Sequence, residues 1–258
     1  MFDFNCSKEG KEYSLPLNKK LTKKQQAIAD REVELVQLAK AIVEEQGFTN
    51  LTMDRLTAFS AYSKGTIYNH FCSKEDVIIA LCIDGIKQEA KMLSRGISFE
   101  GSTREKMIAM HVAYRTFVLQ EPELTACVLL ANSPWIIEKA SAERVKVLKQ
   151  LEEQVTGLVN RIVTEAVEKG ELTLTSEYTV ESIVFSNWSM AFGFNALATN
   201  IVKKQSTEEH NVSLSLLGNI NMLFDGLKWL PLSTEHDYKK VWQKVEQELF
   251  YEEIHRLV

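Results

Sequence analysis

The chain has few residues that break helices, with four prolines and 11 glycines among 258 residues. This scarcity excludes a collagen-like repeat and Pro/Gly-rich low complexity, and it favours long helices. Hydrophobic residues make up 45% of the chain and charged residues 25%, the balance of an ordinary globular protein. The length allows one large domain or two small ones, with enough apolar surface to form a core without disulfides.

Cysteines are also scarce, and their spacing excludes the common metal sites. Cys6, Cys72, Cys82 and Cys127 form no C-x-x-C pair, and together with the five histidines they match no zinc template. We therefore expect reduced thiols, no metal and no cofactor, in a cytoplasmic protein. The N-terminus lacks a basic segment followed by an apolar run, so no secretory signal is expected.

The chain has no overall excess of positive charge, because its net charge is −5 at pH 7. The charge is uneven, however. Residues 1–72 carry ten Lys/Arg and nine Asp/Glu, a net of +1, whereas residues 73–258 carry 20 and 26, a net of −6. Four lysines cluster in the first part: Lys19, Lys20, Lys23 and Lys24. This asymmetry points to an N-terminal end that faces DNA.

Helical periodicity follows an N-terminal arm, residues 1–20, which we expect to be flexible. Gly47 stands where a C-cap glycine belongs, and Thr52, Ser63 and Ser73 are suited to N-caps. No segment shows the alternation of a strand bounded by a hairpin turn, so the predicted fold class is all-α. The predicted helices span residues 22–46, 53–59, 63–70, 75–95, 103–120, 123–131, 135–139, 142–169, 177–202, 211–229 and 235–256.

The most informative region runs from Leu51 to Val77, where two short helices flank a tight turn and a longer helix precedes them. This arrangement is a helix-turn-helix unit. On the second short helix, Ile67 and Phe71 lie four residues apart and are expected to face the core. That leaves a polar and aromatic set facing outward, suited to the major groove of DNA: Lys64, Thr66, Tyr68, Asn69 and His70.

Each residue type in this region suits a contact with DNA. Gly65 lets the backbone approach a phosphate closely, Thr66 can contact a thymine methyl group, and lysines supply charge toward phosphates. Free N–H groups at helix starts bind phosphates. The predicted DNA-binding residues are Lys23, Lys24, Thr52, Ser63, Lys64, Gly65, Thr66, Tyr68, Asn69, His70 and Lys74.

The sequence SKGTIYNHFCSKEDV, with the approach GFTNLT before it, resembles the DNA-binding region of the tetracycline-repressor (TetR) family over about residues 24–85. The resemblance implies an N-terminal three-helix helix-turn-helix DNA-binding domain, residues 21–72, and a C-terminal helical ligand-binding and dimerisation domain, residues 73–258. It also implies a sequence-specific transcription regulator, typically a repressor released by a small-molecule effector.

Two positions depart from the family pattern. Ala61 stands in the turn where the family usually has glycine, and a left-handed backbone there would cost alanine about 1–2 kcal/mol. Either the turn differs or packing tolerates the strain. Phe59 stands where a charged surface residue is common, and it is expected to pack against the N-terminal arm or another part of the protein.

Two consecutive helices in the C-terminal half are nearly free of charge, Ser182–Val202 and Asn211–Phe224. The first of these helices contains seven polar side chains, which would be costly in lipid, so we do not expect it to span a membrane. Their small residues, such as Ala191, Gly193 and Gly218, favour close packing between subunits, and the resemblance implies the same four-helix interface. We predict a homodimer formed through residues 177–230 on a palindromic double-stranded DNA operator, with a buried monomer core as the alternative.

The middle helices carry methionine and aromatic residues that suit a small apolar or aromatic effector. The predicted ligand-binding residues are Met107, Met110, His111, Tyr114, Phe117, Trp135, Trp188 and Phe192. The simpler interpretation of each is a core residue. The amphipathic segment 235–256 is expected to pack on this domain or to extend the dimer interface.

Other functions remain as rivals. The nearest keeps the fold but lacks a small-molecule ligand, and is controlled by a protein partner or acts as an activator. An enzyme is disfavoured because the sequence has no nucleophile–base pair at motif spacing, no Gly-rich phosphate loop and no HExxH.

Overall fold

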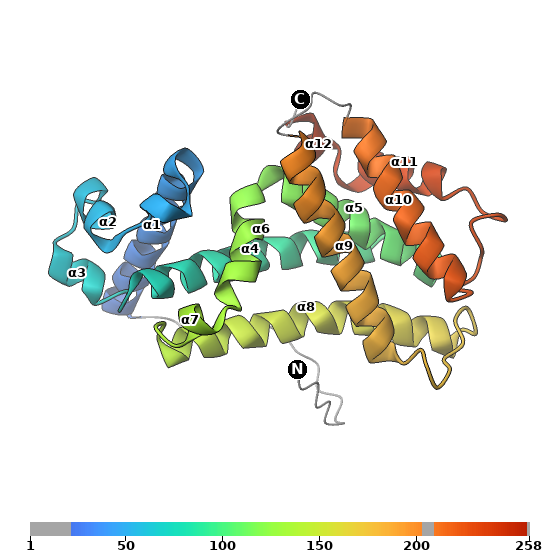
Figure 1. The fold of residues 1–258 in the computed structure, drawn as a ribbon, viewed down its shortest axis with the longest axis horizontal. Helices are drawn as coiled ribbons and strands as arrows, with labels where there is room; N and C mark the ends of the chain where they lie inside the picture. Colours follow the sequence, from blue (N-terminus) through green and yellow to red (C-terminus); the bar gives the residue numbers. More distant parts are fainter. Residues whose placement is uncertain (1–21, 203–208, 257–258) are drawn as a thin grey trace. The chain divides into compact units, whose positions relative to one another are not determined.

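The computed structural model describes residues 22–202 and 209–256, and these residues form helices and connecting turns without a strand (Figure 1). The prediction of an all-α fold is therefore confirmed. The helices are α1 (Lys23–Gln46), α2 (Met53–Phe59), α3 (Lys64–Tyr68), α4 (Lys74–Ile97), α5 (Thr103–Gln120), α6 (Pro122–Ala131), α7 (Pro134–Ile137), α8 (Ala142–Glu168), α9 (Val180–Val202), α10 (Glu209–Gly226), α11 (Tyr238–Leu249) and α12 (Tyr251–His255), with a short 3₁₀ turn η1 (Phe48–Asn50).

The chain divides into two compact units, one ending at His70 and the other beginning at Phe71. In the first unit, α2 packs against both α1 and α3. Its core is apolar and almost completely buried, and includes Leu35, Ala39, Leu56 and Ile67. Helix α3 has only five residues and cannot be stable alone, so burial of Ile67 holds it in place.

The predicted capping residues fix where α2, α3 and α4 start and where α1 ends. Thr52, Ser63 and Ser73 each accept a hydrogen bond from the backbone N–H three residues later, which confirms them as N-caps. Gly47 ends α1 with a φ of +77°, a conformation that favours glycine.

In the second unit, α4 lies at the centre and packs against α5, α6 and α8. A Cβ added at Gly96 of α4 would lie 2.8 Å from the carbonyl oxygen of Ala109, so glycine allows α5 to approach α4 closely. Helix α8 also packs on α9, and α9 packs on α10 (Figure 1). Helix α11 packs on α5 and α4, the first of the two placements expected for the C-terminal segment.

The main departures from the predicted helices lie near the C-terminus. The segment predicted as one helix, 235–256, is divided at Phe250, whose side chain is fully buried. Helix α10 ends at Gly226, three residues earlier than predicted, and Lys228 follows with a positive φ of 56°. Trp229 is fully buried and donates a 2.9 Å hydrogen bond to Thr103 Oγ1, so tertiary contacts decide this end.

Two features of the described residues bear on other classes of protein. None of the helices they form combines the length and apolar character needed to cross a membrane. The same residues contain no group of three or more His, Cys, Asp or Glu side chains arranged to hold a metal ion.

Candidate nucleic-acid interface

Helix α3 presents a polar surface from a well-anchored backbone. Ser63 caps the helix by accepting from the N–H of Thr66, and Ile67 is completely buried beneath it. The opposite side exposes Lys64, Gly65, Tyr68 and Asn69, whereas Thr66 is half-buried with Oγ1 2.9 Å from Ser63 Oγ. This short helix therefore offers an ammonium, a phenol and an amide to a partner outside the protein.

Lys64 contacts two neighbouring side chains. Its Nζ donates to Asp54 Oδ1 of α2 at 2.8 Å, and it lies 5.9 Å from the centre of the Tyr68 ring. The hydrogen bond to Asp54 raises the pKa of Lys64 above its usual value, so the side chain is cationic at neutral pH. Both partners of the ion pair are exposed to solvent, and such pairs exchange readily for another anion.

His70 does not face outward as the sequence predicts. Its side chain is only 5% exposed, and Nδ1 lies 3.6 Å from Glu32 Oε2 of α1. Helix α3 ends at Tyr68, so the backbone at His70 no longer follows the helical pattern that placed it on the polar face. The structure thus gives His70 an internal contact within the first unit.

The turn before α3 avoids the strain that alanine would suffer in a left-handed backbone. Among the described non-glycine residues, a positive φ occurs at Lys228 and not at Ala61. Ser60 Oγ instead accepts from the N–H of Tyr62, and the Tyr62 hydroxyl donates to Glu34. This turn therefore differs from one that requires glycine. Phe59, at its start, is 59% exposed.

The remaining predicted DNA contacts are distributed over both units. Lys23, Lys24 and Thr52 are exposed in the first unit, and Lys74 is half-buried at the start of α4 in the second. Lys19, Lys20 and the predicted arm 1–20 lie outside the described residues.

Arg55 is a candidate that the sequence analysis missed. It is exposed in the first turn of α2, and its backbone N–H donates to the cap residue Thr52 at 3.1 Å. A cation three residues after an N-cap was the signal available in the sequence. Arg55 directly follows Asp54, the ion-pair partner of Lys64, and adds a further exposed cation to the first unit.

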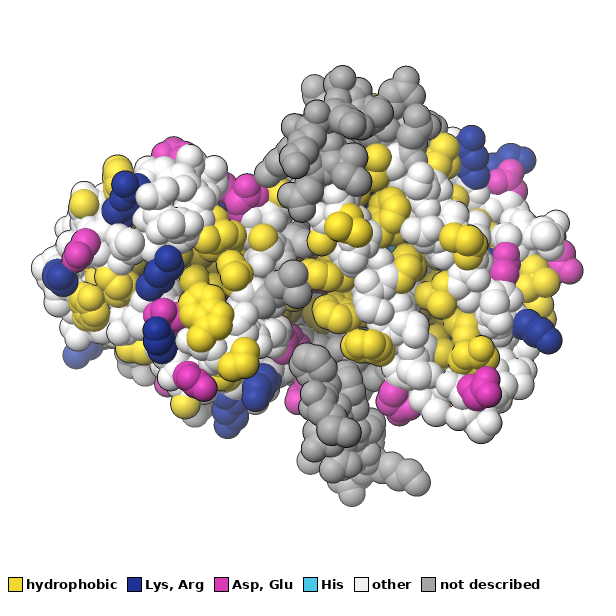
Figure 2. All heavy atoms as spheres, viewed as in Figure 1, with side chains coloured by type: hydrophobic (Ala, Val, Ile, Leu, Met, Phe, Trp, Pro, Cys, Tyr) yellow, Lys and Arg dark blue, Asp and Glu magenta, His cyan; other side chains and the backbone are white. Residues whose placement is uncertain are grey.

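An exposed apolar face runs along α9 and α10 of the second unit. Phe185, Trp188, Leu197 and Met222 are between 46% and 68% exposed, and Figure 2 shows hydrophobic side chains gathered over these helices. A Cβ added at Gly193 or at Gly218 would meet no atom within 4 Å. Ala191, in contrast, is buried inside its own subunit. These apolar side chains are clustered rather than scattered singly, and clusters of this kind mark interaction surfaces.

The predicted ligand-binding residues are not brought together at one place. Met107, Met110, His111 and Phe117 are buried in the core of the second unit, and Tyr114 is half-buried. By contrast, Trp188 is 46% exposed on α9 and stacks on the half-buried Phe192, with ring centres 5.4 Å apart. Trp135 on α7 is 49% exposed.

His111 joins α5 to α9 in this core. Its Nε2 lies 2.8 Å from Asn187 Oδ1, and four residues later Arg115 donates to Asn195 Oδ1 at 3.1 Å. Burial lowers the pKa of His111 to about 4, although the hydrogen bond with Asn187 acts in the opposite direction. The imidazole is therefore neutral at pH 7 and serves as a hydrogen-bonded core residue.

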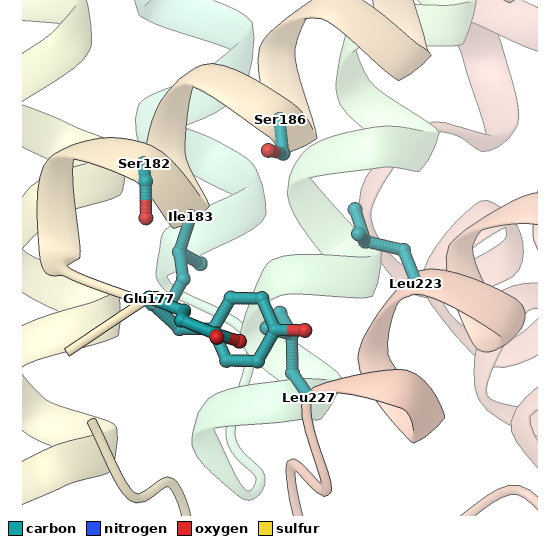
Figure 3. A pocket seen from close by; sticks show the side chains of 7 residues that line it. Glu177, Ser182, Ile183, Ser186, Leu223 and Leu227 are labelled. Atoms are coloured by element: carbon teal, nitrogen blue, oxygen red, sulfur yellow. The ribbon is translucent and has the colours of Figure 1, made fainter. Parts of the chain in front are cut away.

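Two hollows are lined by described residues. One, of about 170 Å³, lies where Ser182 and Ile183 of α9 face Leu223 of α10 and Leu227, which directly follows that helix (Figure 3). The other, of about 440 Å³, follows one side of α8 near Lys146. Neither is lined by a predicted ligand-binding residue.

The N-terminal region of the chain matches a known protein family. The family model for "Bacterial regulatory proteins, tetR family" matches residues 35–81. An uncharacterised HTH-type transcriptional regulator of Mycobacterium tuberculosis H37Rv is 25% identical over 143 residues, covering 55% of this chain and 66% of that protein. The match to this relative thus spans slightly less than two thirds of its length.

Solved structures share the fold over most of the chain. A TetR/AcrR-family transcriptional regulator from Thermobifida fusca has a TM-score of 0.56 and 19% identity, covering 76% of this chain and 98% of its own. The regulator FadR from Bacillus subtilis, in complex with stearoyl-CoA, has a TM-score of 0.57 and 15% identity, covering 74% and 96%.

Proposed function

The chain belongs to the TetR family of DNA-binding transcriptional regulators, and we propose that it acts as a cytoplasmic dimeric repressor that a small molecule releases from its operator. This family consists of regulators rather than enzymes. We assign DNA binding to residues 21–72 and effector binding with dimerisation to residues 73–258. The observation that carries the proposal is the surface of α3, where polar residues point outward above the buried Ile67.

We assign the reading of base edges to Tyr68, Asn69 and Thr66. An exposed amide and hydroxyl on a helix can hydrogen-bond base edges in the major groove, and the Thr methyl group can contact thymine. Lys64 supplies charge toward a phosphate, and Gly65 leaves room for the DNA backbone. Ser63 fixes the start of α3 as its N-cap, and so fixes the position of these side chains on the first unit.

Dimerisation is supported by the exposed apolar face of α9 and α10. A second copy would cover Leu197 and Met222, which a single subunit leaves 67% and 68% exposed. The predicted interface, residues 177–230, contains both helices. Because a twofold interface presents two identical α3 helices, the matching operator is a palindrome with half-sites about one helical turn apart.

We propose that the effector has a large apolar or aromatic part. The interior of the second unit is apolar around Met107, Met110 and Phe117, and a solved relative with the same fold holds stearoyl-CoA. An effector weakens DNA binding only to the extent that it binds the DNA-free conformation more tightly than the DNA-bound conformation. The predicted contact residues would then have to separate around the ligand.

A second candidate keeps DNA binding but replaces the small molecule with a protein partner, or makes the protein an activator. The packing of the described core favours it, because Met107 and Phe117 are 1% and 2% exposed and neither described hollow reaches them. A thermal-shift screen with apolar carboxylates and acyl-CoA esters separates the candidates. A concentration-dependent rise in Tm that is matched by release of DNA supports the effector.

Selection of genomic fragments by the purified protein tests the DNA-binding proposal. We expect the selected fragments to share a palindromic consensus, and binding to survive an excess of unrelated competitor DNA. Fragments without a shared sequence would contradict the proposed operator specificity.

A further inference from the structure

One buried carboxylate, that of Asp76, serves the N-termini of two helices. It lies in the first turn of α4, where Oδ2 accepts from the N–H of Cys72 at 3.2 Å. Its Oδ1 accepts from the N–H and the Oγ of Ser141, at 3.0 and 2.8 Å, at the start of α8. Because the N-terminus of each helix is electropositive, a carboxylate shared by α4 and α8 holds these two ends together.

Arg144 of α8 completes this cluster. Its Nε lies 3.2 Å from Asp76 Oδ1, and the two side chains are only 15% and 2% exposed. The guanidinium also lies 4.9 Å from the centre of the Phe71 ring, which is completely buried. Arg144 therefore contacts both the carboxylate and the first residue of the second unit.

The residues between these contacts are tied to α8 as well. Ser73, the N-cap of α4, donates from Oγ to the carbonyl oxygen of Lys139 at 2.7 Å. The start of the second unit, residues 71–76, is thus fixed to residues 139–144 by a cation–π contact, an ion pair and several hydrogen bonds. His70, the last residue of the first unit, is covalently bound to Phe71, so the same cluster fixes the point where the first unit is attached.

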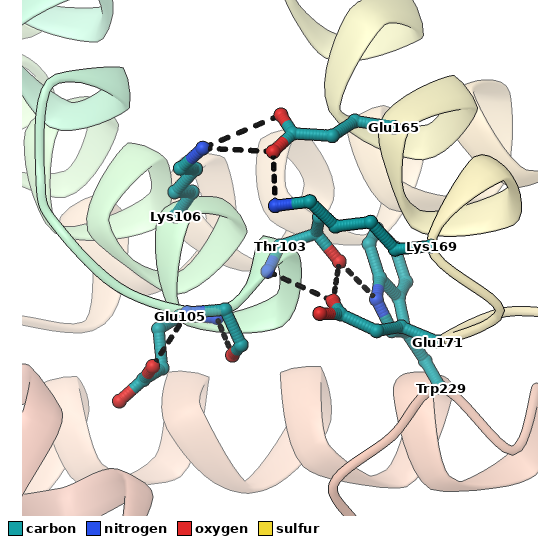
Figure 4. A network of polar contacts seen from close by, with 8 residues as sticks. Thr103, Glu105, Lys106, Glu165, Lys169, Glu171 and Trp229 are labelled. Atoms are coloured by element: carbon teal, nitrogen blue, oxygen red, sulfur yellow. Dashed lines mark hydrogen bonds and ion pairs between the residues drawn. The ribbon is translucent and has the colours of Figure 1, made fainter.

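Helix α8 extends this attachment through the second unit. Near its far end, Glu165 accepts from Lys106 of α5 at 3.0 Å and from Lys169 at 2.7 Å (Figure 4). Along its length α8 packs on α9, part of the proposed dimer interface. One continuous helix therefore connects the attachment point of the DNA-binding unit with the helices that would join two subunits.

We propose that Asp76 and Arg144 are positioning residues that set the separation of the two DNA-binding units, and through it the half-site spacing that the dimer accepts. This inference rests on the proposed function, because spacing has meaning only for a dimer on a palindrome. Loss of the cluster frees the attachment point at Phe71, so that the two α3 helices sample a wider range of separations. Such a dimer discriminates less between its best site and sites whose half-site spacing is altered.

The test compares the full-length protein with Arg144→Gln on a series of palindromes. The series takes the selected operator and changes the distance between its half-sites by one or two base pairs in either direction. Arg161→Gln is the matched control, because Arg161 is exposed on the same helix. Fluorescence anisotropy gives Kd for each DNA, and sedimentation and Tm measurements confirm a folded dimer.

We expect the wild type and Arg161→Gln to lose affinity about tenfold or more on altered spacings, whereas Arg144→Gln loses less than about threefold or prefers a new spacing. A lower Tm with an unchanged spacing profile would show a merely structural role and overturn the proposal. An Arg161→Gln profile as flat as that of Arg144→Gln would overturn it too.

Ser141→Ala keeps the proposal testable if Arg144→Gln does not fold, because it removes one hydrogen bond to Asp76 and leaves the ion pair. Its profile is read in the same way, with partial flattening expected. Failure of the proposed function is a separate result, because a wild type that prefers no palindrome over unrelated DNA fails before any variant is compared.

Discussion

Lys64 on α3 and Asp54 on α2 form an ion pair at 2.8 Å in the surface that we assign to DNA. The two side chains are 60% and 81% exposed, and pairs this open to solvent contribute little to stability. Asp54 therefore keeps Lys64 oriented over the helix but does not hold it strongly. Because the Asp54 carboxylate is already exposed to water, a DNA phosphate can replace it as the partner of Lys64 at little cost.

Replacing Lys64 with alanine is expected to weaken binding to all DNA sequences and to reduce the salt dependence. Each phosphate contact contributes about one unit to the slope of log K against log salt, so the slope falls by about one. Anisotropy titrations at four salt concentrations give the slope. Lys146→Ala, an exposed lysine on α8, is the control and leaves the slope unchanged. An unaltered slope for Lys64→Ala would remove the residue from the interface.

Replacing Asp54 with asparagine is expected to strengthen DNA binding. The substitution removes a negative charge near the phosphates and frees Lys64, so affinity rises about threefold to tenfold at low salt. The gain should shrink as salt increases, because the effect is electrostatic. The same titrations measure it, and weaker binding at low salt would show that Asp54 is needed to orient Lys64.

Placing a charge at Leu197 is expected to separate the subunits. The side chain is 67% exposed within one subunit, so Leu197→Glu has little effect on folding of the subunit but buries an unpaired carboxylate in a dimer. Sedimentation equilibrium should show a monomer that binds the operator at least about a hundredfold more weakly. Val147→Glu, on an exposed apolar position of α8, is the control. A dimer that persists in Leu197→Glu contradicts this interface.

Exposed and internal positions of one helix could be distinguished only in the structure. The small size of Ala191 predicts a place in the interface, but the residue is 5% exposed and belongs to the core of the subunit. The sequence pattern predicts Trp188 among the ligand-binding aromatic residues of the interior, whereas in the structure it lies on the exposed face. Which side of a nearly uncharged helix faces its own core depends on neighbours distant in sequence, because no polar stripe marks the outer face.

Local chemistry, in contrast, made the helix starts predictable. Thr52, Ser63 and Ser73 begin helices as expected, because their hydroxyl groups satisfy backbone N–H groups three residues away. The division at Phe250 has no such signal, since neither proline nor glycine is present. The partnership of Asp76 with Arg144 spans 68 positions and was equally invisible.

Replacing Ala61 with glycine is expected to lower the free energy of unfolding by about 0.4–1 kcal/mol. Ala61 has no positive φ, so glycine relieves no strain and only adds freedom to the unfolded chain. Urea denaturation monitored by circular dichroism measures the change. A gain of about 1–2 kcal/mol would instead reveal a left-handed backbone at this turn.

His111 and Glu89 are expected to have opposite effects on stability between pH 4.5 and 6.5. Burial lowers the pKa of His111 from 6.5 to about 4. In this pH range the imidazole is therefore protonated only in the unfolded chain, so the contribution of His111 to stability falls as pH falls. Burial raises the pKa of Glu89 from 4.5 to about 7. The carboxyl group is therefore protonated mainly in the folded chain, so the contribution of Glu89 to stability rises as pH falls.

Difference curves isolate the two groups. Relative to the wild type, the free energy of unfolding of His111→Gln should increase as pH falls, with a slope approaching 1.4 kcal/mol per unit. That of Glu89→Gln should decrease with a similar slope. Urea titrations at pH 4.5, 5.5 and 6.5 supply the values, and parallel curves for all three proteins would refute the shifted pKa values of both side chains.

Footprinting of a selected fragment at two salt concentrations tests the central claim most directly. A dimeric TetR-family regulator should protect two symmetric half-sites centred about one helical turn apart, and Tyr68→Ala should weaken both equally. The protection should persist at moderate salt for this fragment while binding to unrelated DNA is lost. Protection of a single half-site, or protection that vanishes with salt on every DNA alike, would contradict the account.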